Sequence, residues 1–82
     1  MTAGRTALAT ESEALDLRGV RCPLNWARAR VRLDALPVGT RLALHVDDPR
    51  AVRDIPGAAE ACGHVVLDIR AHGDSWWIEI ER

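Results

Sequence analysis

Apolar and polar residues alternate along four short stretches of the chain, and this alternation predicts four β-strands. The first covers 14–18, where two leucines flank an aspartate before a glycine breaks the pattern. The second covers 41–46, the third 65–71 and the fourth 76–81. Because the His-Gly-Asp-Ser sequence at 72–75 is typical of a tight turn, the last two strands are expected to form an antiparallel hairpin.

A helical repeat of apolar residues replaces the alternation in the segment 24–36. Trp26, Ala29, Leu33 and Leu36 recur every three or four residues, which places them along one side of a helix. The alternating alanines and arginines imitate a strand, but both residue types favour helices and the segment exceeds normal strand length. We therefore predict a helix that ends before the Pro-Val-Gly sequence that follows.

The segment after the second strand has the same helical spacing, at Val52, Ile55, Ala59 and Cys62. The Asp-Asp-Pro sequence at 47–49 supplies an N-cap and a proline suited to a first turn. Because Pro56 lies inside the repeat, we expect one turn over 49–53 and a restart capped by Asp54. Cys62 is expected to be a small buried apolar residue.

These elements follow one another in the order β-α-β-α-β-β. Each strand–helix–strand unit predicts parallel pairing with a right-handed crossover, and the hairpin adds an antiparallel strand. The expected fold is an α+β two-layer sandwich, a four-stranded mixed sheet with two helices on one face. The other face is left open, and His45, Arg70 and Trp77 are expected to lie on it.

Length and composition restrict the class of protein. The 82 residues suffice for one domain, and a hydrophobic share of 48% is too high for a disordered chain. We expect a flexible N-terminal tail at 1–13 and a domain at 14–82, with a first helical turn packed on the body as the alternative for the tail. No segment has the pattern of a membrane span or a signal peptide, and two cysteines cannot form a disulfide framework, so a cytoplasmic protein is expected.

The charge is small in total and uneven along the chain. A net charge of −1 argues against direct binding of nucleic acid, and the three scattered histidines predict no metal site. All eleven basic residues are arginines, and five of them lie within 14–33 beside a single aspartate. Arg28, Arg30 and Arg32 are expected to form the solvated side of the first helix; docking to an acidic partner is the alternative.

Cys22 is the candidate reactive residue. With Pro23, it lies where the first helix is predicted to begin, and the positive end of the helix dipole stabilises a thiolate there. Arg18 and Arg21 are expected to add positive charge, and Gly19 permits a sharp turn out of the strand. These features favour a nucleophilic or sulfur-carrying cysteine, with a packed or capping cysteine as the alternative.

The sequence LDLRGVRCP at 15–23 resembles the opening signature of the TusA/SirA family of small sulfur-carrier proteins. The sequences DDP at 47–49, RDIP at 53–56 and GH at 63–64 resemble the second-helix region of the same family. The likeness covers 14–82 and implies the β-α-β-α-β-β fold already predicted.

The resemblance also implies an activity. Cys22 accepts sulfane sulfur as a persulfide and relays it to an acceptor protein thiol. A cysteine desulfurase or a rhodanese-type enzyme is the donor, and no metal or organic cofactor is needed. Destinations in the family include tRNA thiolation, molybdenum-cofactor enzymes and sulfur oxidation. A carrier of this kind works as a monomer.

The chain departs from the family signature at Asn25, where the family has a second proline. This departure leaves the cysteine chemistry in place but leaves the donor and acceptor open. Trp26 is expected to fill the core, and Asp16 to cap or orient the loop rather than act as a base. Two other functions remain: a non-catalytic interaction or regulatory module of the same fold, and RNA binding. The second is disfavoured because Trp76 and Trp77 point to opposite faces of the sheet, so at most one could stack on a base.

Overall fold

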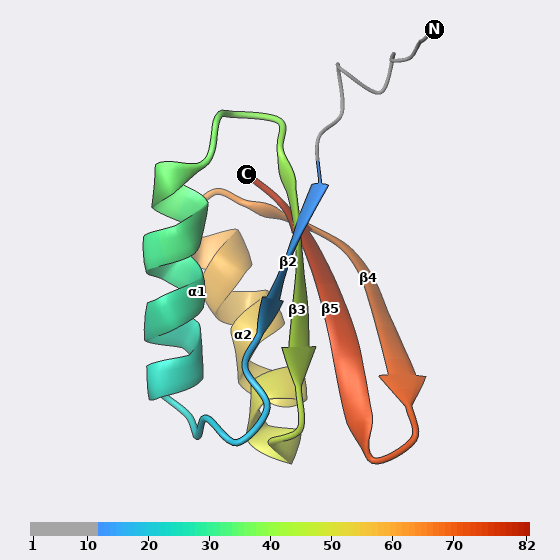
Figure 1. The fold of residues 1–82 in the computed structure, drawn as a ribbon. Coiled ribbons are helices and arrows are strands. Elements are labelled where there is room, and N and C mark those ends of the chain that lie inside the picture. The colour runs from blue at the N-terminus through green and yellow to red at the C-terminus, as the bar shows by residue number, and fades with distance from the viewer. Residues whose placement is uncertain (1–11) are drawn as a thin grey trace, which may run out of the picture.

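The structure is a computed structural model that describes residues 12–82 (Figure 1). Its elements confirm the predicted order: β2 (Ser12–Asp16), α1 (Leu24–Ala35), β3 (Arg41–Val46), α2 (Pro49–Ala61), β4 (Val65–His72) and β5 (Ser75–Glu81). The four strands form one mixed sheet, and both helices cover the same face of it (Figure 1). The α+β two-layer sandwich is therefore confirmed.

The strand order in the sheet is β2-β3-β5-β4. Only β2 and β3 pair in parallel, while β5 pairs antiparallel with both β3 and β4. The expected direct parallel pairing of the third predicted strand with the second is thus wrong, because β5 lies between them. The burial explains this order: Ile78 and Ile80 of β5 are fully buried, as suits a central strand, whereas most of β4 is exposed, as suits an edge.

The core lies between the helices and the sheet. Each helix buries one stripe: Ala29, Leu33 and Leu36 at α1, and Ala51, Ile55 and Ala59 on α2. The sheet contributes Leu42, Leu44, Val46, Ile78 and Ile80, and Leu17 follows β2 into the same core. Trp26 packs against this core, as predicted. The amphipathic pattern of each element is thus satisfied by one shared interior.

The first strand begins and ends two residues earlier than predicted. It spans Ser12–Asp16, because its register against β3 runs from Ser12 opposite Arg41 to Asp16 opposite His45. Two residues of the expected tail, 12 and 13, therefore belong to the sheet. The rest of that expected tail, 1–11, lies outside the described residues.

The second helix is continuous, so the predicted break before Asp54 is wrong. Asp48 caps its N-terminus and Pro49 occupies the first turn, as predicted, but Pro56 lies inside the helix. Asp54 pairs with the neighbouring Arg53 instead of capping a new start. The stripe of Ala51, Ile55 and Ala59 needs one unbroken helix to reach the sheet, and this burial outweighs the hydrogen bond that Pro56 removes.

Cys62 is exposed, which contradicts the prediction that it is buried. It is the C-cap of α2, and its backbone N–H donates to the carbonyls of the last turn. Because α2 ends at Ala61, Cys62 does not continue the apolar stripe of the helix, and its side chain is exposed.

The open face of the sheet carries the residues predicted for it. His45 lies opposite Trp77 in the register of β3 and β5, and Arg70 of β4 lies opposite Trp77 from the other side. The His45 and Trp77 rings stack with centroids 4.3 Å apart. Trp76 instead packs against the core, so the two tryptophans do point to opposite faces.

Candidate functional site

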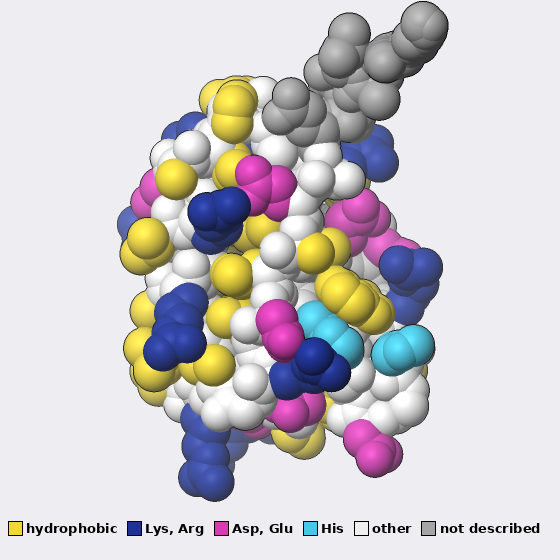
Figure 2. Space-filling view, in the orientation of Figure 1, with side chains coloured by type: hydrophobic (Ala, Val, Ile, Leu, Met, Phe, Trp, Pro, Cys, Tyr) yellow, Lys and Arg dark blue, Asp and Glu magenta, His cyan; other side chains and the backbone are white. Residues whose placement is uncertain are grey.

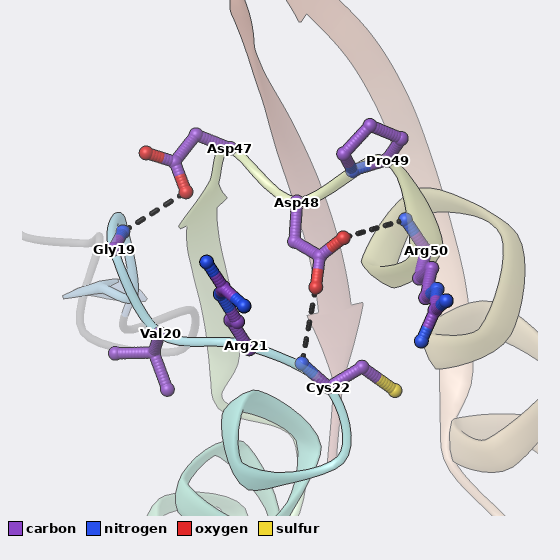
Figure 3. A pocket seen from close by; sticks show the side chains of 8 residues that line it. All are labelled: Gly19, Val20, Arg21, Cys22, Asp47, Asp48, Pro49 and Arg50. Carbon is purple, nitrogen blue, oxygen red and sulfur yellow. Dashed lines mark hydrogen bonds between the residues drawn. The ribbon is translucent and has the colours of Figure 1, made fainter.

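Two loops meet where the parallel strands β2 and β3 end. Because both carboxyl ends lie at one edge of the sheet, the segment 17–23 comes beside 47–50. The backbone N–H of Leu17 donates to the carbonyl of His45 over 2.8 Å and holds the start of the first loop beside the end of β3. A cleft of about 530 Å³ opens between the loops (Figure 3), lined by Gly19, Val20, Arg21, Cys22, Asp47, Asp48, Pro49 and Arg50.

Cys22 lines this cleft and is half-buried. Pro23 is the N-cap of α1, so the thiol lies one residue before the cap. Figure 3 shows Sγ directed away from the carboxylate of Asp48 and towards the side of the cleft where Arg50 lies. The predicted placement of Cys22 at the start of the first helix is thus confirmed. The positive end of the α1 dipole favours a negative charge at this position.

Asp48 joins the cysteine loop to α2. One carboxylate oxygen accepts the backbone N–H of Cys22 at 3.0 Å, and the other accepts the N–H of Arg50 at 3.0 Å, which caps the helix (Figure 3). These two N–H donors, chiefly that of Cys22, hold the pKa of Asp48 below its usual range, helped by the charges of Arg50 and Arg21. The backbone of Cys22 is therefore anchored by a carboxylate that stays ionised in the folded protein.

The pKa of Asp48 predicts a defined effect of acid. A carboxyl whose pKa is lowered by folding stabilises the protein above its unfolded pKa of about 3.9, and this contribution is lost as the pH falls through the lower folded value. The thermal midpoint of Asp48→Asn should therefore lie below that of wild type at pH 7, with the gap closing towards pH 2. Asp34→Asn, which removes an exposed carboxylate from α1, is the control. A gap that stays constant with pH would contradict the role of the charge.

Gly19 makes the turn that returns the chain to the cleft. Its φ is +80°, a conformation that favours glycine, and its N–H donates to Asp47 over 2.9 Å. On the strand side of this turn, Asp16 and Arg18 bond to each other. The carboxylate of Asp16 accepts the N–H of Arg18 at 3.0 Å and pairs with its guanidinium at 2.9 Å. These bonds keep the pKa of Asp16 well below its usual range. Asp16 thus orients the loop, as expected.

The positive groups at the cleft differ from those predicted. Arg21 lines the cleft, but Arg18 is not among the lining residues and is engaged with Asp16. Arg50, which the sequence reasoning did not select, lines the opposite wall. The structure therefore places Arg21 and Arg50 in the same cleft as Cys22, one from each loop.

Asn25 lies beneath the loop and is completely buried. Its side-chain amide donates to the carbonyl of Val20 at 3.4 Å, and its side-chain oxygen accepts the N–H of Trp26 at 2.7 Å. The residue that replaces the second proline of the signature thus ties the loop to the first turn of α1 from within. Asn25 itself does not line the cleft but bonds to Val20, which does, so Asn25 supports the loop that forms the site.

Five cleft residues escaped the sequence reasoning as members of the site: Val20, Asp47, Asp48, Pro49 and Arg50. The sequence 47–50 was interpreted only as a turn and a helix cap, which is correct for α2. The predicted parallel pairing of the first two strands could have identified these residues, because it places the loops after both strands at the same edge of the sheet.

Within 12–82, no three histidine, cysteine, aspartate or glutamate side chains are grouped so that they could hold a metal ion. Nor does that part of the chain contain a helix long and apolar enough to cross a membrane.

Comparison with known proteins assigns the family. The family model described as sulfurtransferase TusA matches residues 13–82. The sulfur carrier protein TusA of Buchnera aphidicola is 30% identical over 74 residues, which cover 88% of this chain and 94% of that protein. The sulfur carrier protein TusA of Allochromatium vinosum is 28% identical over 75 residues, covering 92% and 99%.

A solved structure supports the fold alone. The crystal structure of the SirA-like protein from Desulfitobacterium hafniense matches with a TM-score of 0.72 at 20% identity, covering 83% of this chain and 93% of that one. The family model spans nearly all of the described residues. The chain therefore belongs to the TusA family of sulfurtransferases.

Proposed function

We propose that this protein is a sulfur carrier that holds sulfane sulfur as a persulfide on Cys22. The observation that carries the proposal is the position of Cys22: a half-buried cysteine in a cleft, one residue before the N-cap of α1, in a chain whose family match spans 13–82. The names of its relatives as sulfur carriers support the same role.

The proposed reaction is two successive exchanges at sulfur. The Cys22 thiolate attacks the terminal sulfur of a donor persulfide, the donor S–S bond breaks, and its electron pair leaves on the donor thiolate. Cys22 then carries the persulfide. An acceptor thiolate attacks the terminal sulfur in turn, and the Cys22 thiolate leaves. Because the sulfur keeps its oxidation state throughout, the relay needs no added oxidant or reductant.

The surroundings of Cys22 suit both steps, since a negative charge on sulfur appears in each. The N-terminus of α1 favours that charge, and Arg21 and Arg50 line the same cleft. Asp48 positions the cysteine: its carboxylate accepts the N–H of Cys22 and holds the backbone, while Sγ points away from the carboxylate (Figure 3). We assign Gly19 and Pro23 to shaping the loop and Arg18, Asp16 and Asn25 to supporting it.

We propose a cysteine desulfurase or a rhodanese-type enzyme as donor and a protein thiol as acceptor. Both cysteines are free, and a reducing cytoplasm would keep them so.

The proposal is tested by loading the protein with sulfur. The full chain is incubated with a cysteine desulfurase and cysteine, and in parallel with a rhodanese and thiosulfate, and its intact mass is measured. We expect a gain of about 32 Da, one sulfur atom, which a reductant reverses because a persulfide is a reversible modification. The absence of this gain with both donors would overturn the proposal and favour the non-catalytic module.

The two cysteines differ in a way that tests the local electrostatics. Cys62 is the more exposed thiol, so accessibility alone predicts that iodoacetamide labels it first. However, Cys62 lies at the C-cap of α2, where the helix dipole disfavours a thiolate, and Cys22 lies at a helix start. We expect Cys22 to be labelled several-fold faster near neutral pH, measured by peptide mass spectrometry. Faster labelling of Cys62 would contradict this.

A further inference from the structure

Strand β4 forms one edge of the sheet. In the part of the chain that the structure describes, β4 pairs only with β5, so no strand lies along its outer edge. Figure 1 shows β4 on the side of the sheet opposite β2. An edge of this kind offers its backbone N–H and C=O groups to another strand, and its side chains decide which strand fits.

The side of β4 that faces the helix layer is apolar and incompletely covered. Ile69 lies opposite the buried Ile78 in the register of the hairpin, so both side chains are on the helix side of the sheet. Even so, 42% of Ile69 is exposed. Ala71 is on the same side, opposite Trp76, and is exposed as well. Since β4 is the strand farthest from α1, the helix layer ends before it covers this apolar edge.

The other side of β4 has two opposite charges. Arg70 lies opposite Trp77 on the open face of the sheet. Asp68 is two residues earlier and therefore on the same face, and its carboxylate pairs with the guanidinium of Arg70 at 3.1 Å. Both side chains are exposed. Figure 2 shows acidic and basic side chains beside one another on the β4 side of the molecule, at the right of the view.

These positions make the edge complementary to a second copy of itself. In an antiparallel pair related by a two-fold axis, one residue lies opposite its own copy, and the residues on either side of it lie opposite each other. With Ile69 at the axis, Asp68 of each copy lies opposite Arg70 of the other. This register forms two cross-strand ion pairs and packs Ile69 against its copy. With Asp68 or Arg70 at the axis, two like charges would lie opposite each other instead.

The backbone at Ile69 shows how a single chain covers this edge. Its N–H donates to one carboxylate oxygen of Asp68 over 2.9 Å, an acceptor outside the ladder with β5. The other oxygen of Asp68 pairs with Arg70. If Asp68 turns to Arg70 of a second copy, the N–H of Ile69 is released to donate to the carbonyl of Ile69 opposite. Because the bonds are exchanged rather than only gained, the association is reversible and weak.

We propose that this protein self-associates through β4, as a two-fold symmetric dimer in which the two copies of β4 pair antiparallel about Ile69. The sheets of both copies then continue as one sheet with all helices on the same face, so that α2 of each copy flanks the apolar edge. The cleft of Cys22 lies at the ends of β2 and β3 and stays open. The monomer expected from the sequence is then the dilute form.

The experiment measures the mass of the full chain in solution. Sedimentation velocity is run at concentrations up to about 1 mM, because a short edge pairing is a small interface. Asp68→Arg and Arg70→Asp each place like charges opposite each other across the axis. Asp34→Arg and Arg30→Asp are matched controls with the same changes in charge at exposed positions on α1. Circular dichroism checks the fold of each variant.

We expect the mass of wild type to rise with concentration from the 9.0 kDa of one chain towards twice that value. Asp68→Arg and Arg70→Asp should each raise the dissociation constant by about tenfold or more, because like charges then face each other twice. Both controls should stay within about twofold of wild type. An equimolar mixture of Asp68→Arg and Arg70→Asp should associate again, because every charge in the mixed pair then lies opposite its complement.

A wild type that keeps the mass of one chain up to about 1 mM would overturn the proposal. A dimer that tolerates Asp68→Arg and Arg70→Asp as well as it tolerates the controls would show that β4 is not the interface. Failure of the mixture to associate would rule out the register about Ile69. None of these outcomes bears on the sulfur chemistry of Cys22, which the loading experiment tests separately.

Discussion

Replacing Cys22 by serine should abolish sulfur loading completely. The hydroxyl of serine has nearly the shape of the thiol but cannot form a persulfide, so the mass gain of about 32 Da should disappear. The fold should survive, because Asp48 bonds to the backbone N–H of Cys22 and not to its side chain. Intact mass spectrometry after incubation with the donor measures the loss, and thermal unfolding checks that Cys22→Ser remains folded.

Cys62→Ser is the matched control for this experiment. It removes the other thiol of the chain, from an exposed position at the end of α2. We expect it to load as wild type does. If Cys62→Ser lost the added mass while Cys22→Ser kept it, the assignment of the site to Cys22 would be wrong.

Replacing Leu33 by alanine should have the largest effect on stability. Leu33 is completely buried in the stripe of α1, and truncating such a leucine typically costs about 2–5 kcal/mol in the free energy of unfolding. A domain of this size has about 5–15 kcal/mol in total, so the variant should be close to unfolding at 37 °C. Urea denaturation followed by circular dichroism measures the change.

Val31→Ala lies on the exposed side of the same helix and provides the comparison. Because Val31 is 72% exposed, its truncation should change the free energy of unfolding by less than about 0.5 kcal/mol. Equal losses in Leu33→Ala and Val31→Ala would show that the burial of α1 is not as the structure describes it.

The correct and incorrect predictions have separate physical causes. Helix α1 was predicted from alanine and arginine propensity and one apolar stripe, and these are local properties. The break at Asp54 was predicted because Pro56 disfavours a helix interior, but packing of Ile55 and Ala59 on the sheet decides that the helix continues. Cys62 was predicted to be buried only because it continues the helical spacing of apolar residues, but α2 ends at Ala61 and leaves Cys62 exposed.

By itself the sequence determined which segments form helices and strands, their order, and the position of Cys22 at a helix start. Periodicity, capping residues and the cysteine motif are local and need no knowledge of distant contacts. Only the tertiary structure decided that β5 lies between β3 and β4, and that Asp48 and Arg50 belong to the site of Cys22. Strand order and the meeting of two loops depend on contacts between residues more than 25 positions apart, as the 26-residue separation of Cys22 and Asp48 illustrates. Such contacts are selected by the burial of the whole core, which no single segment encodes.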